Sequence, residues 1–503
     1  MRLFSTSLLA LFGMSCTPSL ADVTASTLPV MEGAEAGEHP NILLIVTDQQ
    51  SYNAVSALAT GNKSFCQTPN IDRLVKKGIS FTQTYCANPV SVASRFSLFT
   101  GMYGGQYGVR NNLCPAADEA AIREMLQVNG MGNVFRQGGY ETVYGGKVHL
   151  PFAGESGSKF TAPASYGFDT YLTKDEREEL GHITASFIKN RKAEDKPMLL
   201  VASFLNPHDI CLEGSTNLSS EIKGNKPEKT ETVRMLRERV AAIDSIHFYR
   251  NLAPQLPSNF ARTLGYPDTK CLRKRFLDLP DWYWRKYRWT YAELVKMVDD
   301  SIGEILDALD ANPELKRNTV VVFTSDHGEM QGAHQTMGKS MPYDECQRVP
   351  LIFSGANVRS GGMTKDIPVC NGVDLLPTLC ELAGISLPGR MDGVSLAPSI
   401  GKTKRTTEAK RDYIYMESET FVSIVKGNYK YILFDGDGNR EMLFLKDSGE
   451  AKNIIGEHPA EASELRSIAQ SHVGKLPVTV LKKAKNAGKV TGQEKKNKMK
   501  KNK

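Results

Sequence analysis

The chain has 503 residues, of which 41% are hydrophobic and 23% charged, and its formal net charge is +6. This composition is typical of a soluble globular protein with a large core, and it excludes a wholly disordered chain and a polytopic membrane protein. The positive charge is concentrated in residues 481–503, which contain ten lysines and one acid, so the remaining chain carries −3. We therefore expect a disordered basic tail over residues 476–503 and no nucleic-acid partner.

The N-terminal residues have the features of an export signal. Met1 and Arg2 precede an apolar run over residues 3–14, and Ser19-Leu20-Ala21 offers a small-x-small cleavage site. We expect a signal peptide over residues 1–21, a linker over 22–38 and export to the periplasm. The residues before Cys16 also resemble a lipoprotein signal, so the alternative is a lipid anchor at Cys16 in the outer membrane. No other apolar run reaches the roughly 18 residues of a spanning helix.

Three unbroken apolar runs predict strands that are covered on both faces, at residues 42–46, 198–202 and 320–323. Helical patterns lie between them, and the clearest begins near Tyr291 with apolar residues at three- and four-residue spacing. Strands that alternate with helices predict an α/β fold with a large, mostly parallel or mixed sheet between helices. We assign this domain to residues 39–404.

The pattern changes after residue 405. Short alternating strands are expected at residues 413–416, 421–426 and 429–434, with Gly427-Asn428 as a turn between the last two. These predict a smaller antiparallel α+β subdomain over residues 405–475. The nine cysteines contain no Cys-x-x-Cys pair, and their pairing stays open.

Polar residues follow all three predicted strands, in the segments Thr47-Asp48-Gln49-Gln50, Asn206-Pro207-His208-Asp209 and Ser325-Asp326-His327-Gly328. Asp48 and Asp326 could converge as oxygen ligands for a divalent cation, with the carbonyl of Gln49 as a third. His327 is either a ligand or a hydrogen-bonding neighbour of the ligands. The alternative for each aspartate is a helix cap.

Further cations and histidines accompany these acids. Lys147 and His149 alternate, so both would point to one side of an extended chain, and Lys339 lies in a glycine-bearing loop after the third strand. Together with a metal they would neutralise a tetrahedral anion, although each alone is more often solvated or structural. The aromatic segment 281–289 could stack on sugar rings or pack in the core, and both interpretations stay open.

The segment Ser91-Val92-Ala93-Ser94-Arg95 places a hydroxyl and an arginine within one turn of a predicted helix start. It resembles the C/S-x-[PA]-x-R signature of the type I sulfatases, members of the alkaline-phosphatase superfamily. The resemblance covers nearly the whole mature chain, with matching segments in the same order and spacing at 41–50, 68–74, 91–101, 139–149, 324–328 and 348–351.

The resemblance implies that Ser91 is oxidised to a formylglycine, whose hydrated aldehyde presents two hydroxyls on one carbon. One hydroxyl attacks sulfur, and deprotonation of the other expels sulfate. The family positions also imply one calcium ion per chain, bound by Asp48, Gln49, Asp326 and His327. Arg95 and Lys147 match residues that secure the formylglycine, and His149 matches the base that releases sulfate. His208 matches the acid for the leaving oxygen, and Lys339 matches a cation on the sulfate.

Several positions depart from the common family pattern. A serine at position 91 implies the serine-type radical maturase of anaerobic bacteria, and Gln49 and His327 replace the more usual Asp and Asn. The resemblance implies an exported sulfatase that acts on a sulfated carbohydrate. The alternatives are a phosphonate or phosphodiester hydrolase of the same superfamily, and a non-catalytic sulfoglycan-binding protein if Ser91 is not oxidised.

Overall fold

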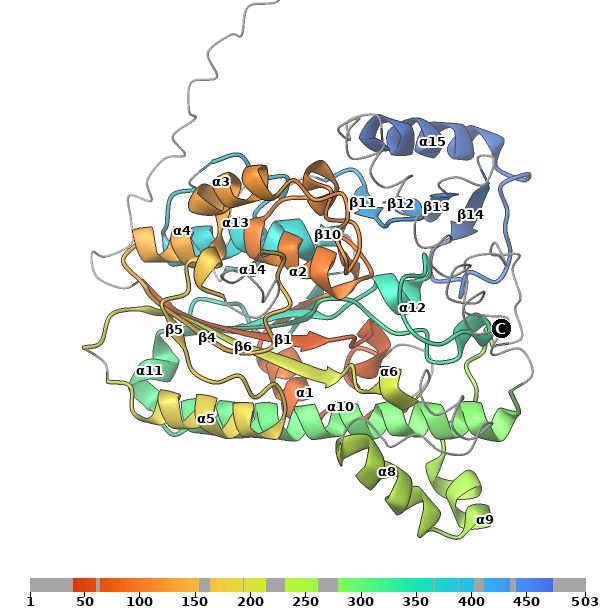
Figure 1. The fold of residues 1–503 in the computed structure, drawn as a ribbon, viewed down its shortest axis with the longest axis horizontal. Helices are drawn as coiled ribbons and strands as arrows, with labels where there is room; N and C mark the ends of the chain where they lie inside the picture. The colour runs from red at the N-terminus through yellow and green to blue at the C-terminus, as the bar shows by residue number, and fades with distance from the viewer. Residues whose placement is uncertain are drawn as a thin grey trace, which may run out of the picture. The chain divides into compact units, whose positions relative to one another are not determined.

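An eight-stranded sheet forms the centre of the fold (Figure 1). The computed structural model describes residues 39–59, 64–152, 163–192, 194–213, 231–260, 279–364, 367–387, 389–401, 411–434 and 440–473. The strand order is β5-β4-β6-β1-β7-β8-β2-β9. The strands are β1 (Asn41–Asp48), β2 (Ile79–Phe81), β4 (Glu141–Gly146), β5 (Thr170–Tyr171), β6 (Met198–Pro207), β7 (Thr319–Ser325), β8 (Leu351–Gly355) and β9 (Gly362–Thr364).

Most neighbours in this sheet are parallel. β1 is hydrogen-bonded in parallel to β6 on one side and to β7 on the other, and β4 continues the parallel order beyond β6. β8 runs antiparallel to both of its neighbours, β7 and β2. The predicted α/β class with a mostly parallel or mixed sheet is therefore confirmed, and the three predicted strands lie within β1, β6 and β7.

Helices cover both faces of the sheet, which explains why its central strands are apolar throughout (Figure 1). Ile42 and Leu44 of β1 pack in a hydrophobic cluster with residues of α2, α3, α4 and α13. Leu43 and Ile45, which point to the opposite face, pack with residues of α1, α5 and α10. These helices are α1 (Pro69–Lys77), α2 (Ser91–Thr100), α3 (Glu119–Asn129), α4 (Met131–Gln137), α5 (Glu178–Lys189), α10 (Asp281–Asp310) and α13 (Asn371–Ala383).

The predicted start of the long helix near Tyr291 is wrong, because α10 begins at Asp281. The aromatic residues at its start continue the buried stripe at helical spacing, with Trp284 and Tyr287 both below 2% exposed. Trp289 is 5% exposed, whereas Trp282 is 49% exposed. Two of the three tryptophans thus pack in the core, as the second interpretation of this segment predicted.

A separate four-stranded antiparallel sheet follows in the order β11-β12-β13-β14. Its strands are β11 (Ile414–Glu417), β12 (Phe421–Lys426), β13 (Tyr429–Phe434) and β14 (Glu441–Leu445), and α15 (Pro459–Val473) packs on it. Gly427 has a φ of 56°, a left-handed conformation that glycine adopts freely in the tight turn between β12 and β13. The expected C-terminal antiparallel subdomain is confirmed as part of the fold class.

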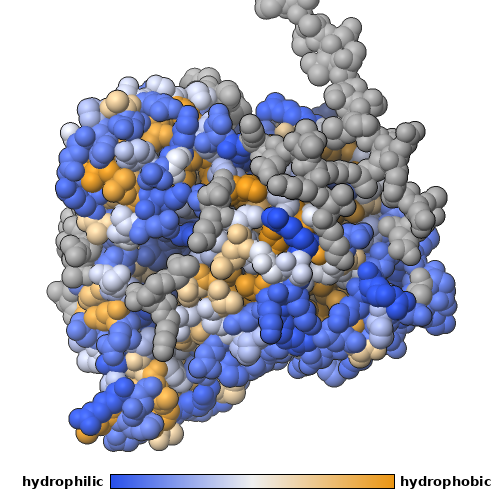
Figure 2. Space-filling model, turned by 180° about the vertical axis from the view of Figure 1, so that it is seen from behind, coloured by the Kyte–Doolittle hydropathy of each residue, from blue (hydrophilic) through white to orange (hydrophobic). Residues whose placement is uncertain are grey.

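Two short strands, β3 (Thr84–Tyr85) and β10 (Val369–Cys370), pair with each other in a two-stranded sheet. The other α-helices in the described residues are α6 (Ile210–Leu212), α8 (Glu231–Ala241), α9 (Ser245–His247), α11 (Pro313–Arg317), α12 (Asp344–Gln347) and α14 (Ala397–Ile400). Hydrophilic residues predominate on the face in Figure 2, with hydrophobic residues in small groups between them. Within the described ranges, no helix has the length and apolarity to cross a membrane.

Seven cysteines lie in the described part of the chain, and no disulfide joins any two of these seven. The predicted signal peptide, the linker over residues 22–38, Cys16 and the lysine-rich tail lie outside the described residues.

Candidate active site

Four parallel strands bring the predicted site residues to one edge of the sheet. β4, β6, β1 and β7 are consecutive in the sheet, and Lys147, His208, Asp48 and Asp326 lie at or just beyond their carboxyl ends. Because parallel strands end at the same edge, residues that are far apart in the sequence meet there. The structure thus explains why each of the apolar strands is followed by polar residues.

Ser91 is the first residue of α2 and is fully buried at this edge. Lys339 Nζ donates a hydrogen bond to Ser91 Oγ at 3.1 Å. The Nε2 atom of His327 lies 2.9 Å from the same oxygen, and Asp48 Oδ1 lies 3.4 Å from it. The serine hydroxyl is therefore surrounded by the carboxylate at the end of β1 and by an imidazole and a cation from the loops that follow β7.

The carboxylate of Asp48 uses its two oxygens differently. Its Oδ2 atom lies 2.5 Å from Lys147 Nζ and 3.4 Å from Arg95 Nη2. Its Oδ1 atom faces the other way, 3.4 Å from Ser91 Oγ and 3.8 Å from His327 Nε2. Burial raises the pKa of Asp48, but the neighbouring ammonium groups outweigh this effect and hold it well below its usual range.

Asp326 shows the same division of its oxygens. Arg95 Nε donates to Asp326 Oδ2 at 2.9 Å, and the backbone N–H groups of Gln49 and His327 donate to Oδ1 at 3.0 and 2.8 Å. Burial and the adjacent Asp48 raise the pKa of Asp326 against the opposing effect of Arg95. The two carboxylates therefore repel each other, and a cation placed between them would relieve that repulsion.

Arg95 contacts both aspartates at their Oδ2 atoms, on the side opposite to His327. Its side chain is fully buried, and besides the two carboxylates it donates to Ser203 Oγ at 2.8 Å and to the carbonyl oxygen of Lys147 at 3.2 Å. Although burial disfavours its charge, the aspartates raise the pKa of Arg95 above its ordinary value. A permanently charged, planar guanidinium suits this role, because it satisfies several acceptors at fixed angles.

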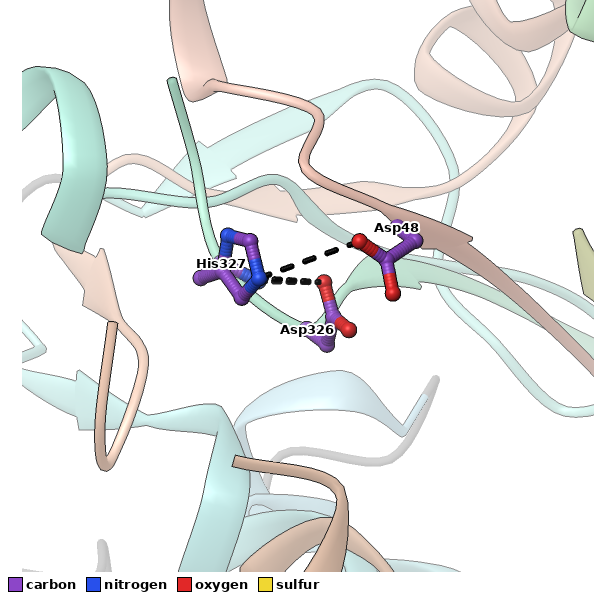
Figure 3. Close-up of side chains that lie close together, drawn as sticks. All are labelled: Asp48, Asp326 and His327. Atoms are coloured by element: carbon purple, nitrogen blue, oxygen red, sulfur yellow. Dashed lines mark hydrogen bonds and ion pairs between the residues drawn. The ribbon is translucent and has the colours of Figure 1, made fainter. Parts of the chain in front are cut away.

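The residues present fit a divalent cation. Ligand atoms of Asp48, Asp326 and His327 lie within 4.8 Å of one another, and all three side chains are buried. Figure 3 shows Nε2 of His327 facing both carboxylates. His327 Nδ1 lies 2.9 Å from the carbonyl oxygen of Gly328, which can only accept, so Nδ1 carries the proton and Nε2 offers its lone pair. Two carboxylates and a neutral imidazole form a reasonable donor set for such an ion.

The side chain of Gln49 is directed away from this group. Its Nε2 atom donates to Glu329 at 2.5 Å and lies 3.2 Å from Cys211 Sγ, while its backbone carbonyl accepts from Tyr291 at 2.9 Å. Gln49 reaches Asp326 only through its backbone N–H. The structure therefore does not bring the Gln49 side chain to the carboxylate pair, and its assignment as a ligand stays a prediction.

The two predicted catalytic histidines lie in a positively charged environment. Burial, followed by the charge of Lys147, lowers the pKa of His149 to about 3. Burial together with Lys339 and Lys147 lowers the pKa of His208 well below its usual range. Both imidazoles are thus neutral at pH 7, and a bound anion would raise their pKa values by offsetting the nearby cations.

The charge balance at this edge favours an anion. Three cations, Arg95, Lys147 and Lys339, face the two carboxylates of Asp48 and Asp326. A divalent ion would make the excess of positive charge larger. A largely buried site with this excess of cations suits a tetrahedral oxyanion.

Comparison with known proteins agrees with this geometry. The family model described as Sulfatase matches residues 40–385, which include the whole of the site. The chain belongs to the sulfatase family. A second model, N-sulphoglucosamine sulphohydrolase, C-terminal, matches residues 332–473 and thus covers the antiparallel sheet of this sulfatase.

The sulfatase is similar to enzymes that act on sulfated sugars. It is 29% identical over 452 residues to a Δ4,5-hexuronate-2-O-sulfatase of Bacteroides thetaiotaomicron. The alignment covers 84% of this chain and 85% of that relative. It is 26% identical to an N-acetylglucosamine-6-O-sulfatase of the same organism, with 87% and 86% covered. The structure of a 2-O GAG sulfatase superposes with a TM-score of 0.66 at 26% identity and covers 87% of this chain and 92% of that one. The chain is therefore a sulfuric ester hydrolase of the alkaline-phosphatase-like superfamily.

Some residues of the sulfatase site were not identified from the sequence. Ser203 lies within β6 and accepts from Arg95, but a serine in an apolar strand gives no signal of that role. Glu329 follows the Asp326-His327-Gly328 segment directly, and this adjacency was the signal that could have found it. His334 lies in a different group of possible ligands, with Glu345 and Glu450.

Proposed function

We propose that this sulfatase hydrolyses a sulfate ester on a sulfated carbohydrate and that its nucleophile is a formylglycine made from Ser91. The observation that carries the proposal is the position of Ser91 Oγ, which lies within 3.4 Å of Lys339, His327 and Asp48. A nucleophile at this point is adjacent both to the cations that would hold sulfate and to the carboxylates that would hold a metal ion.

The modified residue and the metal supply chemistry that the twenty standard side chains lack. A hydrated formylglycine supplies one hydroxyl to attack sulfur and a second whose deprotonation releases sulfate. A calcium ion, for which Asp48, Asp326 and His327 are the ligands that the geometry supports, supplies positive charge next to a sulfate oxygen.

The chain's own residues then hold the anion and move protons. Lys339 binds a sulfate oxygen, whereas Arg95 and Lys147 secure the surroundings of residue 91 through their ion pairs with the site aspartates. We assign His208 to protonation of the leaving oxygen and His149 to deprotonation of the hydroxyl that expels sulfate. The lowered pKa of His149 suits a base, because a neutral imidazole is ready to accept a proton. His208 can donate a proton only after the bound anion has offset the nearby cations and raised its pKa.

We further propose that the substrate is a sulfated saccharide built from uronic acid and amino sugars. The support is the similarity to a hexuronate-2-O-sulfatase and to an N-acetylglucosamine-6-O-sulfatase, each aligned over more than four fifths of this chain. Defined mono- and disaccharides that carry a single sulfate at the 2-O or the 6-O position would decide between the two positions. Release of sulfate from neither type would contradict this substrate class.

The cellular context proposed here follows from the sequence. The N-terminal 21 residues would direct export to the periplasm, with a lipid anchor at Cys16 as the alternative for an outer-membrane form. Ser91 would require a serine-type radical maturase of an anaerobic bacterium. Because Ser91 is fully buried in the folded chain, the maturase would need access to it before folding is complete.

The decisive experiment measures both the modification and the activity. Mass spectrometry of the peptide that contains residue 91, from protein produced with a serine-type maturase, should show the loss of two hydrogens. The same protein should cleave an aryl sulfate faster than the matching aryl phosphonate ester, and Ser91→Ala should abolish the activity. An unmodified Ser91 in active protein would contradict the formylglycine, and a phosphonate turned over orders of magnitude faster would contradict the preference for sulfate.

A further inference from the structure

Glu329 lies in the loop that follows β7, two residues beyond His327, and it is fully buried. Its Oε1 atom accepts hydrogen bonds from Tyr287 Oη at 2.8 Å and from the backbone N–H of Gly338 at 2.6 Å. Its Oε2 atom accepts from Gln49 Nε2 at 2.5 Å. A buried carboxylate costs a large desolvation energy, so these donors are needed to keep it in place.

Two of these donors are next to residues of the active site. Gly338 precedes Lys339, whose ammonium donates to Ser91 Oγ at 3.1 Å. Gln49 follows Asp48, and the backbone N–H of Gln49 donates to Asp326 Oδ1 at 3.0 Å. One carboxylate thus connects the loop that carries the sulfate-binding lysine to the end of the strand that carries a metal-binding aspartate.

Both neighbours have a left-handed backbone. Gly338 has a φ of 84°, and Gln49 has a φ of 74°, which costs a residue with a Cβ atom about 1 kcal/mol or more. Glycine adopts this conformation freely, whereas at Gln49 it persists only where surrounding contacts hold it. The hydrogen bonds to Glu329 are such contacts, because they hold the backbone of Gly338 and the side chain of Gln49 from one side.

We propose that Glu329 is a positioning residue, which holds the Gly338 backbone so that Lys339 reaches residue 91 and which fixes the Gln49 side chain at the end of β1. Glu329 acts through the length of its side chain and through its two acceptor oxygens, and it does not exchange a proton with the substrate. The proposal rests on the proposed function, since it assumes that Lys339 binds the sulfate group.

Two substitutions of Glu329 distinguish the effect of side-chain length from the effect of side-chain charge. Glu329→Gln keeps the length and keeps an oxygen for Tyr287 and Gly338, while the Gln49 amide can turn to present its own oxygen to the new amide. Glu329→Asp keeps the charge but withdraws the carboxylate by one methylene group. Misplacement of this size next to a reacting group typically lowers the rate by tenfold to a hundredfold. We therefore expect kcat/KM to fall about tenfold or more in E329D and to stay within about threefold of the wild type in E329Q.

Glu417 provides a matched control. It is also buried and accepts from a glycine backbone N–H, that of Gly105 at 2.5 Å, and from a tyrosine hydroxyl, that of Tyr415 at 3.1 Å. E417D applies the same shortening to a similar network that involves none of the assigned site residues. It should lower the thermal midpoint but leave kcat/KM within about twofold of the wild type.

Coupling to Lys339 distinguishes positioning from a general loss of stability. E329D should have little further effect on kcat/KM in a Lys339→Ala background, because the residue it positions is then absent. The affinity for inorganic sulfate, measured by calorimetry on unconverted protein, should fall in E329D and in K339A but not in E417D. This second measurement needs neither the formylglycine nor turnover.

The outcomes are distinguishable. If converted wild-type protein neither hydrolyses sulfate esters nor binds sulfate, the proposed function is wrong, and the positioning role is wrong with it. If the wild type does both, the positioning role alone is overturned by any of three results: activity of E329D equal to that of E417D, a tenfold loss in E329Q, or effects of E329D and K339A that multiply independently.

Discussion

Replacing Arg95 by methionine removes the positive charge that lies behind the two site aspartates. The side chain of Arg95 is fully buried and contacts Asp326 at 2.9 Å and Asp48 at 3.4 Å. Methionine has a similar volume but offers no donor. The variant would therefore leave two buried carboxylates without the opposing charge of the guanidinium. The Oγ atom of Ser203 would also lose the hydrogen bond that it accepts from Arg95.

The expected loss of folding stability in Arg95→Met is large. Removal of one partner from a buried ion pair typically destabilises a protein by about 3–5 kcal/mol, because the other charge stays buried. At about 1.4 kcal/mol per factor of ten, this lowers the folding equilibrium constant by roughly two to four orders of magnitude. Arg95→Lys keeps the charge but cannot reach four acceptors at once, so its loss should lie between that of methionine and the wild type.

Urea unfolding, followed by tryptophan fluorescence, measures the free energy of unfolding in each variant. Arg136 is the control, since it pairs with Asp169 at 3.0 Å while both side chains are 50% exposed. Because exposed pairs contribute about 1 kcal/mol or less, Arg136→Met should have a small effect. A loss of less than 1 kcal/mol in R95M, or equal losses in R95M and R136M, would refute the reasoning.

Three further predictions concern the metal, the pH dependence and the tail. Chelation of divalent cations should lower the thermal midpoint of the wild type, and added calcium should restore it, whereas Asp48→Asn should not respond to calcium; an equal response of both proteins would exclude Asp48 as a ligand. Burial raises the pKa of Asp299 from 3.8 to about 6, so the folded state binds its proton more tightly than the unfolded state does. The stability of the wild type relative to Asp299→Asn should therefore fall as the pH rises from 4 to 6, by up to about 3 kcal/mol in urea titrations, and a flat or rising difference would contradict this. Deletion of residues 481–503 should leave the hydrolysis of a small sulfate ester unchanged, since this segment is charged and apolar-poor; loss of turnover in folded protein would show that the tail takes part.

Local patterns determined much of the fold. The continuous apolar runs indicated strands covered on both faces, and β1, β6 and β7 contain them. The turn at Gly427 was found because a left-handed tight turn requires a particular residue type. The start of α10 was placed ten residues too late, because aromatic residues fit a helix start, a stacking surface and a buried stripe equally well until their partners are known.

The active site, too, was predicted from the sequence only in part. The sequence by itself identified the polar residues that follow each strand, because the carboxyl ends of parallel strands are where such residues converge. The tertiary structure alone decided which oxygen of Asp48 faces Lys147 and which faces Ser91, and that Gln49 points to Glu329. These choices depend on contacts between residues up to 280 positions apart, such as that of Gln49 with Glu329, and no local pattern records them. The residue types thus follow from the chemistry of the strand ends, whereas the hydrogen-bond partners follow from the packing of the whole sheet.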